Sequence, residues 1–335
     1  MARCAVLIAV FCLLAPAAAA AAQHGNPMAG GRWFVDPDTA AAQAERDAAA
    51  TGDSATAHAL DAVARTPQAM WFIAADDPDS SGYVHAYFDR WHAGAPDSVP
   101  VLVLHGVPHQ VCAGDNAPGH GDAAAYRGWI DGWARLIGDQ RVVVVLEPDA
   151  LASARCLSPP LRSERYALIA YAARTLSALP HTGVYIDIGA ADWLQLTTAA
   201  KLLKAAGVRY ARGFSLNVTH FDWTANELSY GTKLARRVGG KHFVVNTALN
   251  GRGPLVRRSG FHEWCNPPGR ALGPLPTTRT GNRYADALFW LQNPGLSDGH
   301  CNGGPDVGTF WLRWALELSR DAVHAADFPV VRHRR

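Results

Sequence analysis

Residues 141–152 read RVVVVLEPDALA, and this stretch contains the pattern that decides the fold. The run of β-branched residues is apolar on both faces, which is typical of a parallel strand covered on both sides. Pro148 cannot donate a hydrogen bond to a strand ladder and favours an extended Glu147. The strand is therefore expected to end at Glu147, with Asp149 presented from its carboxyl end.

Similar segments recur along the chain. Runs rich in β-branched and aromatic residues predict further strands at 69–74, 99–105, 183–188, 213–218, 242–247 and 287–292. Stretches with helical spacing lie between them at 123–138, 162–179, 194–206 and 226–238. This alternation predicts an α/β fold with a parallel sheet, whose functional groups lie on loops at the carboxyl ends of the strands.

The composition excludes several classes of protein. Of 335 residues, 49% are hydrophobic and 18% charged, which excludes a disordered or fibrous chain. The 31 basic and 29 acidic residues give a net charge of +2, so no nucleic acid or membrane partner is expected. No repeat, linker or change in composition marks a second module. Residues 23–335 are predicted to form one domain, a monomer without an additional binding module.

The first 22 residues have the features of a secretory signal peptide. One early arginine, a short apolar stretch and an alanine run precede Gln23. The apolar stretch is too short to span a bilayer stably, although a retained membrane anchor is the alternative. We expect a secreted protein, extracellular or periplasmic.

Removal of this signal leaves four of the six cysteines. Cys4 and Cys12 leave with it, and four cysteines outside the cytosol predict two disulfides. Three pairings are possible, of which we favour the sequential one, Cys112–Cys156 with Cys265–Cys301. No CxxC spacing is present, so a zinc site is not expected. We also expect no other metal and no cofactor.

Three acids are expected at one rim of the sheet. Asp149 follows one strand, Asp187 lies inside the apolar run of the next, and Asp298 lies in a loop that also contains Cys301. Two carboxyl groups across a cleft are what glycoside hydrolysis requires, one as acid and one as base or nucleophile. The alternatives are structural: Asp149 as a helix cap, and Asp187 as the partner of an arginine or a backbone amide.

Tryptophans are the second indication of a carbohydrate ligand. Sugar rings stack on indole rings, and several of the 11 tryptophans lie in loops: Trp33, Trp193, Trp223 and Trp264. For any one of them core packing is the alternative. Together with the acids, they favour a polysaccharide substrate.

Several motifs resemble glycoside hydrolase family 6, the inverting cellulases. NPMAGGRWFVDP from Asn26 is similar to the family's entry segment, and LEPDALA to its general-acid motif. YIDIG from Tyr185 and GFSLNV from Gly213 fall on two further family strands. The most specific matches are EWCNPPGRALGPLPTT from Glu263 and ALFWLQNPGLSDGHCNGGP, which ends at Pro305.

The resemblance implies a distorted, incomplete β/α barrel of about seven parallel strands that hydrolyses β-1,4-glucan with inversion. It implies that Asp149 is the general acid, Asp298 the general base and Asp187 a supporting acid. It also implies sequential disulfides. Candidate sugar contacts are Trp33, His105, Asn217, Trp223, Trp264 and Gln292. We expect endo action, because no long extra loops would roof a tunnel.

The chain also departs from the family's pattern near the chemistry, at His105, Gln110, Val111, Ala190, Asn246, Gln292 and Leu296. Val111 stands where the family has an acid that assists the general acid. A carboxylate raises the proton affinity of a neighbouring acid, and valine does not. Two alternatives therefore stay open: a member retuned to another polysaccharide, and a weakly active or inactive glycan-binding protein.

Overall fold

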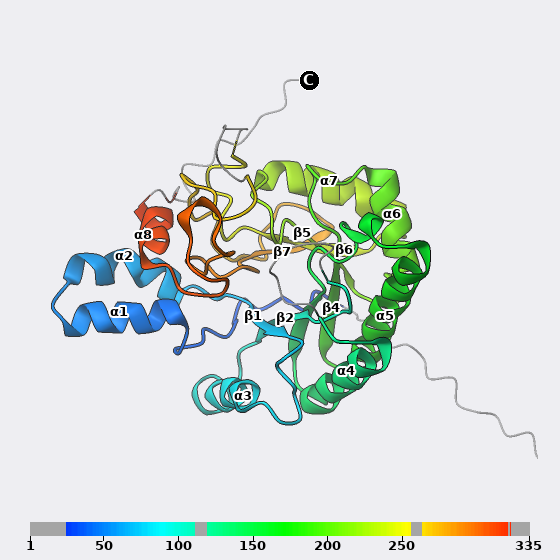
Figure 1. Cartoon of the computed structure of the whole chain (residues 1–335), viewed down its shortest axis with the longest axis horizontal. Coiled ribbons are helices and arrows are strands. Elements are labelled where there is room, and N and C mark those ends of the chain that lie inside the picture. Colours follow the sequence, from blue (N-terminus) through cyan, green and yellow to red (C-terminus); the bar gives the residue numbers. More distant parts are fainter. Residues whose placement is uncertain (1–24, 111–118, 256–262, 321, 323–335) are drawn as a thin grey trace, which may run out of the picture.

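The computed structural model describes residues 25–110, 119–255, 263–320 and 322. Its centre is a parallel sheet of seven strands in the order β1 to β7 (Figure 1). The strands are β1 Met70–Ile73, β2 Val101–His105, β3 Val142–Leu146, β4 Thr182–Asp187, β5 Gly213–Leu216, β6 His242–Asn246 and β7 Ala285–Phe289. All seven predicted strands are confirmed, each within a few residues of its predicted bounds.

The two faces of the sheet bury two different apolar clusters. In β3, Val142, Val144 and Leu146 pack with the surrounding helices, whereas Val143 and Val145 point into the curl of the sheet. Such alternation follows from the two-residue period of a strand. Because both faces are covered, every strand residue in β3 and β4 is buried.

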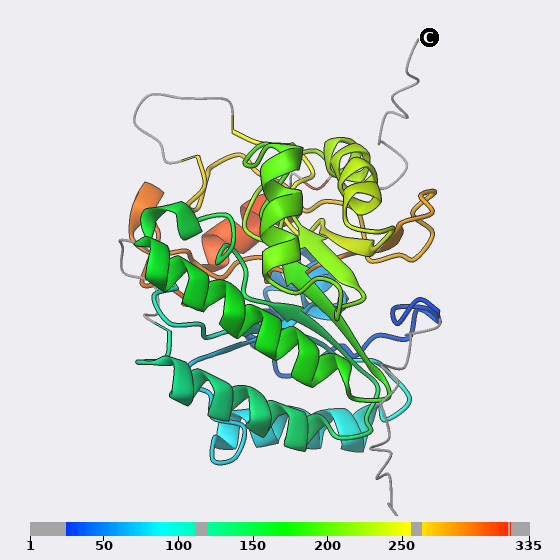
Figure 2. The ribbon, with the colours of Figure 1, turned by 90° about the vertical axis from the view of Figure 1, so that its right-hand side faces the viewer.

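Helices cover the outer face. Those anticipated from sequence are α4 Ala123–Ile137, α5 Pro159–Ser177, α6 Leu196–Ala205 and α7 Thr224–Arg237. Together with α3 (Gly82–Gly94) they form an arc around the outside of the sheet (Figures 1 and 2). Consecutive helices from α4 to α7 contact one another, so the arc is continuous there.

Some helices were not predicted. Besides α3, they are α1 Ala40–Ala50, α2 Ser54–Arg65 and α8 Leu312–Arg320, with short 3-10 turns at Ala154–Cys156 and Cys301–Gly303. Helix α1 is largely alanine, which favours a helix without the strong apolar pattern that identifies one. Its start is set by Thr39, whose side chain accepts a hydrogen bond from the Ala42 amide.

The sheet curls into a half-barrel that does not close through a regular ladder. Next to β1 and β7, the parallel bridge found among the described residues joins Gln68 to Trp290, and the Asn293 side chain donates to the Ala69 carbonyl. The incomplete barrel is thus confirmed. The carboxyl ends of neighbouring strands lie side by side, which brings their loops together.

Among the described residues, none of the helices combines the length and the apolar character needed to cross a bilayer.

Candidate active site

Asp149 and Asp187 meet at the ends of β3 and β4. The backbone amide of Asp149 donates a hydrogen bond of 2.9 Å to Asp187 Oδ1. Asp187 is fully buried and also accepts from the Gly189 amide at 2.9 Å and the Ser215 hydroxyl at 3.0 Å. The anticipated backbone-amide partner is therefore present, and Asp187 fixes the position of the Asp149 main chain.

The Asp149 carboxyl faces the loop after β5. Its Oδ1 accepts a hydrogen bond of 2.6 Å from the Thr219 hydroxyl, so its side chain is not serving as a helix cap. The Asp149 backbone lies in the left-handed region with φ of 66°. Glu147 lies there too, with φ of 54°, so the expectation of an extended Glu147 is wrong. Non-glycine residues rarely adopt this conformation, and it is concentrated at functional sites.

The hydrogen bonds to this pair indicate which of the two carboxyl groups keeps a shared proton. Burial raises the pKa of Asp149, and burial together with the charge of Asp149 raises the pKa of Asp187. Among the residues that the structure describes, Asp187 accepts three hydrogen bonds and Asp149 accepts one. Hydrogen bonds to a carboxylate stabilise its charged form, so the shared proton is better placed on Asp149.

Glu147, part of the quoted LEPDALA stretch, has a role that the sequence did not reveal. It is fully buried, and its carboxyl group accepts hydrogen bonds from the Gly106 and Val107 amides and the Tyr126 hydroxyl. Burial raises its pKa to about 7 despite these bonds. Glu147 therefore ties the loop after β2 to the end of β3, directly beside Asp149.

His105, at the end of β2, is held as a neutral ring. Burial lowers its pKa to about 4. Its Nδ1 lies 3.0 Å from the Gln110 amide nitrogen, and its ring lies 5.5 Å from that of Trp71. Because the Gln110 nitrogen can only donate, Nδ1 is the acceptor and the ring proton is on Nε2. Val111 lies outside the described residues.

Asp298 is anchored by Asn266 on a neighbouring loop. Its Oδ2 accepts from the Asn266 amide at 3.0 Å, and its own amide donates to Asn266 Oδ1 at 2.8 Å. Burial and, to a smaller extent, the charge of Asp149 raise the pKa of Asp298 to about 6. The two carboxyl groups are thus close enough to interact electrostatically.

The disulfide Cys265–Cys301 holds these two loops together. Its half-cystines are separated by 36 residues, for which the chain-entropy model gives a stabilisation of about 4 kcal/mol. Cys112 lies outside the described residues, so the pairing Cys112–Cys156 stays a prediction.

Replacing both cysteines, Cys265→Ala with Cys301→Ala, is expected to lower the free energy of unfolding by about 4 kcal/mol, because the unfolded chain regains loop entropy. Urea unfolding of the oxidised protein measures this change. A decrease below about 1 kcal/mol would show that the bond constrains little.

The candidate sugar contacts differ in accessibility. Trp223 and Trp264 are 46% and 60% exposed, whereas Trp33 is half-buried and packs edge-on against Phe289. Gln292 is half-buried, and its Oε1 has no hydrogen-bond partner among the described residues. The two indoles are therefore exposed enough to contact a ligand, whereas Gln292 Oε1 is a buried atom.

Asn217 has a different role from the predicted sugar contact. It is fully buried, its Oδ1 accepts from the Asp222 amide, and its Nδ2 donates to the carbonyls of Asp222 and Asn246. With φ of 65° it shapes the loop after β5. We therefore assign Asn217 to loop support, because it has no surface for a sugar to contact.

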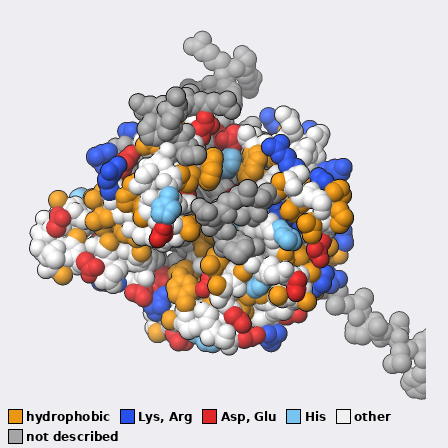
Figure 3. Space-filling model, in the orientation of Figure 1, with side chains coloured by type: hydrophobic (Ala, Val, Ile, Leu, Met, Phe, Trp, Pro, Cys, Tyr) orange, Lys and Arg blue, Asp and Glu red, His pale blue; other side chains and the backbone are white. Residues whose placement is uncertain are grey.

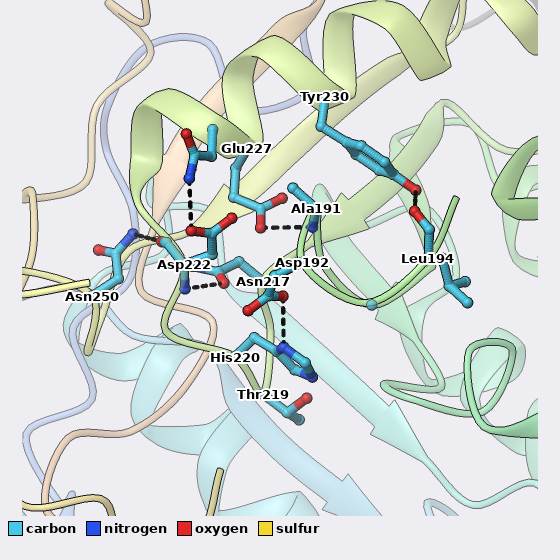
Figure 4. Close-up of polar contacts among 12 residues, drawn as sticks. Ala191, Asp192, Leu194, Asn217, Thr219, His220, Asp222, Glu227, Tyr230 and Asn250 are labelled. Carbon is cyan, nitrogen blue, oxygen red and sulfur yellow. Dashed lines mark hydrogen bonds and ion pairs between the residues drawn. The ribbon is translucent and has the colours of Figure 1, made fainter. Parts of the chain in front are cut away.

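That loop also carries His220, which sequence reasoning missed along with Thr219. The His220 ring stacks on Trp193 at 4.8 Å, and its Nδ1 lies 2.9 Å from Asp192 Oδ1 (Figure 4). Although burial opposes it, Asp192 raises the pKa of His220 overall. The protonated ring in turn lowers the pKa of Asp149. No sequence motif relates these loops; only the adjacency of β4 and β5 brings them together.

On the face of the molecule shown in Figure 3, acidic, basic and hydrophobic side chains are interspersed. A single-sign surface suited to a polyanion is not visible there.

Comparison with known proteins places this geometry in context. The family model "Glycosyl hydrolases family 6" matches residues 28–322. Endoglucanase A from Cellulomonas fimi is 39% identical over 291 residues, which cover 87% of this chain and 61% of that protein. Endoglucanase 1 from Streptomyces halstedii is 38% identical over 329 residues, which cover 93% of this chain and 97% of that protein.

A solved structure extends the comparison to three dimensions. Endoglucanase Cel6 from Mycobacterium tuberculosis, in complex with methyl-cellobiosyl-4-deoxy-4-thio-β-D-cellobioside, matches with a TM-score of 0.82 and 41% sequence identity. The match covers 89% of this chain and 99% of that one. The overall fold therefore has a counterpart in a solved endoglucanase structure.

Proposed function

This chain belongs to glycosyl hydrolases family 6, and we propose that it is a cellulase-type hydrolase that cleaves internal β-1,4 linkages of a glucan with inversion. The proposal rests chiefly on the paired carboxyls Asp149 and Asp298, whose pKa values are both raised by burial. The relatives named endoglucanase support a β-glucan substrate and endo action. The signal-like first 22 residues support secretion.

In the proposed mechanism, Asp149 protonates the oxygen of the leaving sugar. Asp187 holds the Asp149 main chain and, as the better-stabilised anion, leaves the proton on Asp149. Asp298, ionised above its pKa of about 6, removes a proton from the attacking water. Water then attacks the anomeric carbon from the face opposite the leaving oxygen.

An inverting enzyme needs room for this water. The two carboxyl groups are expected about 6.5–9.5 Å apart, which is the separation typical of inversion. Both Asp149 and Asp298 are partly exposed, so water and substrate can reach them.

The proposal is tested by product analysis on a panel of β-glucans. Reducing-sugar release from a β-1,4-glucan, with products of α configuration by NMR at early times, is the expected result. A fall in viscosity that outpaces sugar release would identify endo action. Products of β configuration would contradict inversion, and no release from any glucan would contradict hydrolysis.

The second candidate function is hydrolysis of a different polysaccharide, and one observation favours it. Two of the departures from the family's pattern are His105, which is held neutral, and Gln292, whose Oε1 has no hydrogen-bond partner among the described residues. Faster cleavage of a glycan other than β-1,4-glucan, abolished by Asp149→Asn, would support it. Binding of glycans without any cleavage would instead indicate a binding protein on this scaffold.

Thr219→Val is expected to move the alkaline limb of the pH–rate profile upward by about one pH unit. The Thr219 hydroxyl lowers the pKa of Asp149 by hydrogen-bonding its charged form, so its removal raises that pKa. Asp149 acts while protonated, and a raised pKa keeps it protonated to higher pH. The measurement is kcat/KM against pH, with Thr219→Ser as the control that retains the hydroxyl. An unshifted limb in Thr219→Val would contradict the assignment of Asp149.

A further inference from the structure

A second group of acids lies apart from the proposed catalytic pair. Asp192 is in the loop after β4, Asp222 precedes α7, and Glu227 is in the first turn of α7 (Figure 4). One carboxylate oxygen from each lies within 4.8 Å of the other two. Asp222 and Glu227 are buried, whereas Asp192 is exposed, so the group opens to solvent on one side.

In each of these carboxylates, one oxygen is fixed by the protein. The donors are His220 Nδ1 to Asp192, the Trp223 amide and Asn226 Nδ2 to Asp222, and the Ala191 amide to Glu227. The second oxygen of each accepts no hydrogen bond from the part of the chain that the structure describes. The three carboxylates are therefore held in place while one oxygen of each remains available.

Glu227 is the independent indication that something binds here. Its side chain is 0% exposed, and its Oε2 has no hydrogen-bond partner among the described residues. A buried, unpaired carboxylate oxygen is costly unless a proton or a cation compensates it. The charged side chains that raise the pKa of Glu227 are themselves acids: Asp222, Asp192 and Asp187. The charge of His220 lowers the pKa of Asp222, which burial raises.

We propose that Asp192, Asp222 and Glu227 bind a divalent cation, and that this cation is calcium. The available ligands are carboxylate oxygens, which hard cations prefer. Calcium binds oxygens at about 2.3–2.6 Å, so three oxygens within 4.8 Å of one another can share one ion. Water entering beside the exposed Asp192 would complete its coordination.

The ion would link two segments that flank the proposed active site. It would join the loop after β4, which contains Ala191 and Asp192, to the N-terminal turn of α7. The expected effect is stabilisation of the folded chain, because a ligand that binds only the native state raises its unfolding temperature. This inference does not depend on which glycan the protein cleaves, and none of the three acids is placed in the catalytic step.

The test uses the full secreted chain, stripped of metal with a chelator and dialysed. Terbium, a luminescent substitute for calcium, should be sensitised by excitation of tryptophan, since Trp193 and Trp223 adjoin two of the ligands in sequence. Calcium should displace it with one site per chain. Millimolar calcium should raise the unfolding temperature by about 3–8 °C, and magnesium by less.

Two variants assign the site. Asp192→Asn removes an exposed ligand, and Glu227→Gln replaces the buried carboxyl with a neutral group of the same shape. Each should weaken calcium binding at least 10-fold and reduce the thermal shift. The matched control is Asp79→Asn, which removes an exposed carboxylate paired with Arg135 and should retain full binding.

Three results would overturn the proposal. The first is wild-type protein that shows neither terbium luminescence nor a thermal shift with calcium. The second is a calcium shift that persists unchanged in Asp192→Asn. The third is a Glu227→Gln variant that is more stable than the wild type, with calcium changing the stability of neither protein. That result would show that a proton, and not a cation, compensates the Glu227 carboxylate.

Discussion

Asp149→Asn is expected to lower kcat on a β-1,4-glucan by about 10²- to 10⁴-fold, the contribution typical of a general acid. Asparagine cannot protonate the leaving oxygen, yet its Oδ1 can still accept the hydrogen bond from Thr219. The variant should fold, because the substitution removes one of two neighbouring carboxyl groups that repel each other. Thermal unfolding checks the fold, and steady-state kinetics measures the loss.

Leaving-group dependence separates a lost acid from general damage to the site. A dinitrophenyl glycoside needs little protonation to depart, so Asp149→Asn should cleave it at a rate much closer to that of wild type. The alkaline limb of the pH profile should disappear as well, since the titrating acid is gone. Equal losses on both substrates would show that Asp149 acts through the architecture of the site and not as a proton donor.

The sheet was predictable from sequence because local composition determines it. Strand β3 is an uninterrupted β-branched run that ends before Pro148, and each of the other strands has a comparable signal. Helix α1 was missed because its alanine-rich sequence has few apolar anchors, and its stability comes from packing against α2. Boundaries and polar helices thus depended on tertiary contacts that sequence does not display.

A residue of the candidate site could be predicted from the sequence only where its own segment of the chain was enough to identify it. Asp149 and Asp298 follow predicted strands and Asp187 lies near the end of one, so their meeting at one rim followed from the topology. Thr219 and Glu147 were missed, because their functions depend on partners in other segments, Asp149 for the first and Tyr126 for the second. A buried carboxylate needs a hydrogen-bond donor, and this need could be anticipated from the sequence. The sequence does not identify which residue donates the hydrogen bond.

The acid group at Asp192 illustrates the same limit. The absence of CxxC spacing led to an expectation of no metal, but that criterion addresses zinc and not oxygen ligands. Asp222 and Glu227 lie five residues apart by numbering, whereas Asp192 comes from the preceding β–α loop. Only the folded chain brings the three together, and only burial distinguishes Glu227 from an ordinary surface acid.

Asp298→Ala is expected to lower kcat by about 10²- to 10⁴-fold by removing the base that activates water. In wild type the rate should rise with pH through about 6, because burial raises the pKa of Asp298 to about 6 and the base acts when ionised. The variant should lose this acid limb and keep the alkaline limb of Asp149. The measurement is kcat/KM against pH for both proteins.

Azide provides the sharper measurement, because it attacks without a base and fits the space left by the carboxyl group. With Asp298→Ala it should restore rate and yield a glycosyl azide of inverted, α configuration. The matched control is Asp306→Ala, which removes an exposed carboxylate of the same loop region, paired with His300, and should leave the profile intact. If Asp298→Ala retains the limb near pH 6 and azide adds nothing, another group must activate the water. In that case the two hydrogen bonds between Asn266 and Asp298 would only fix the shape of the loop.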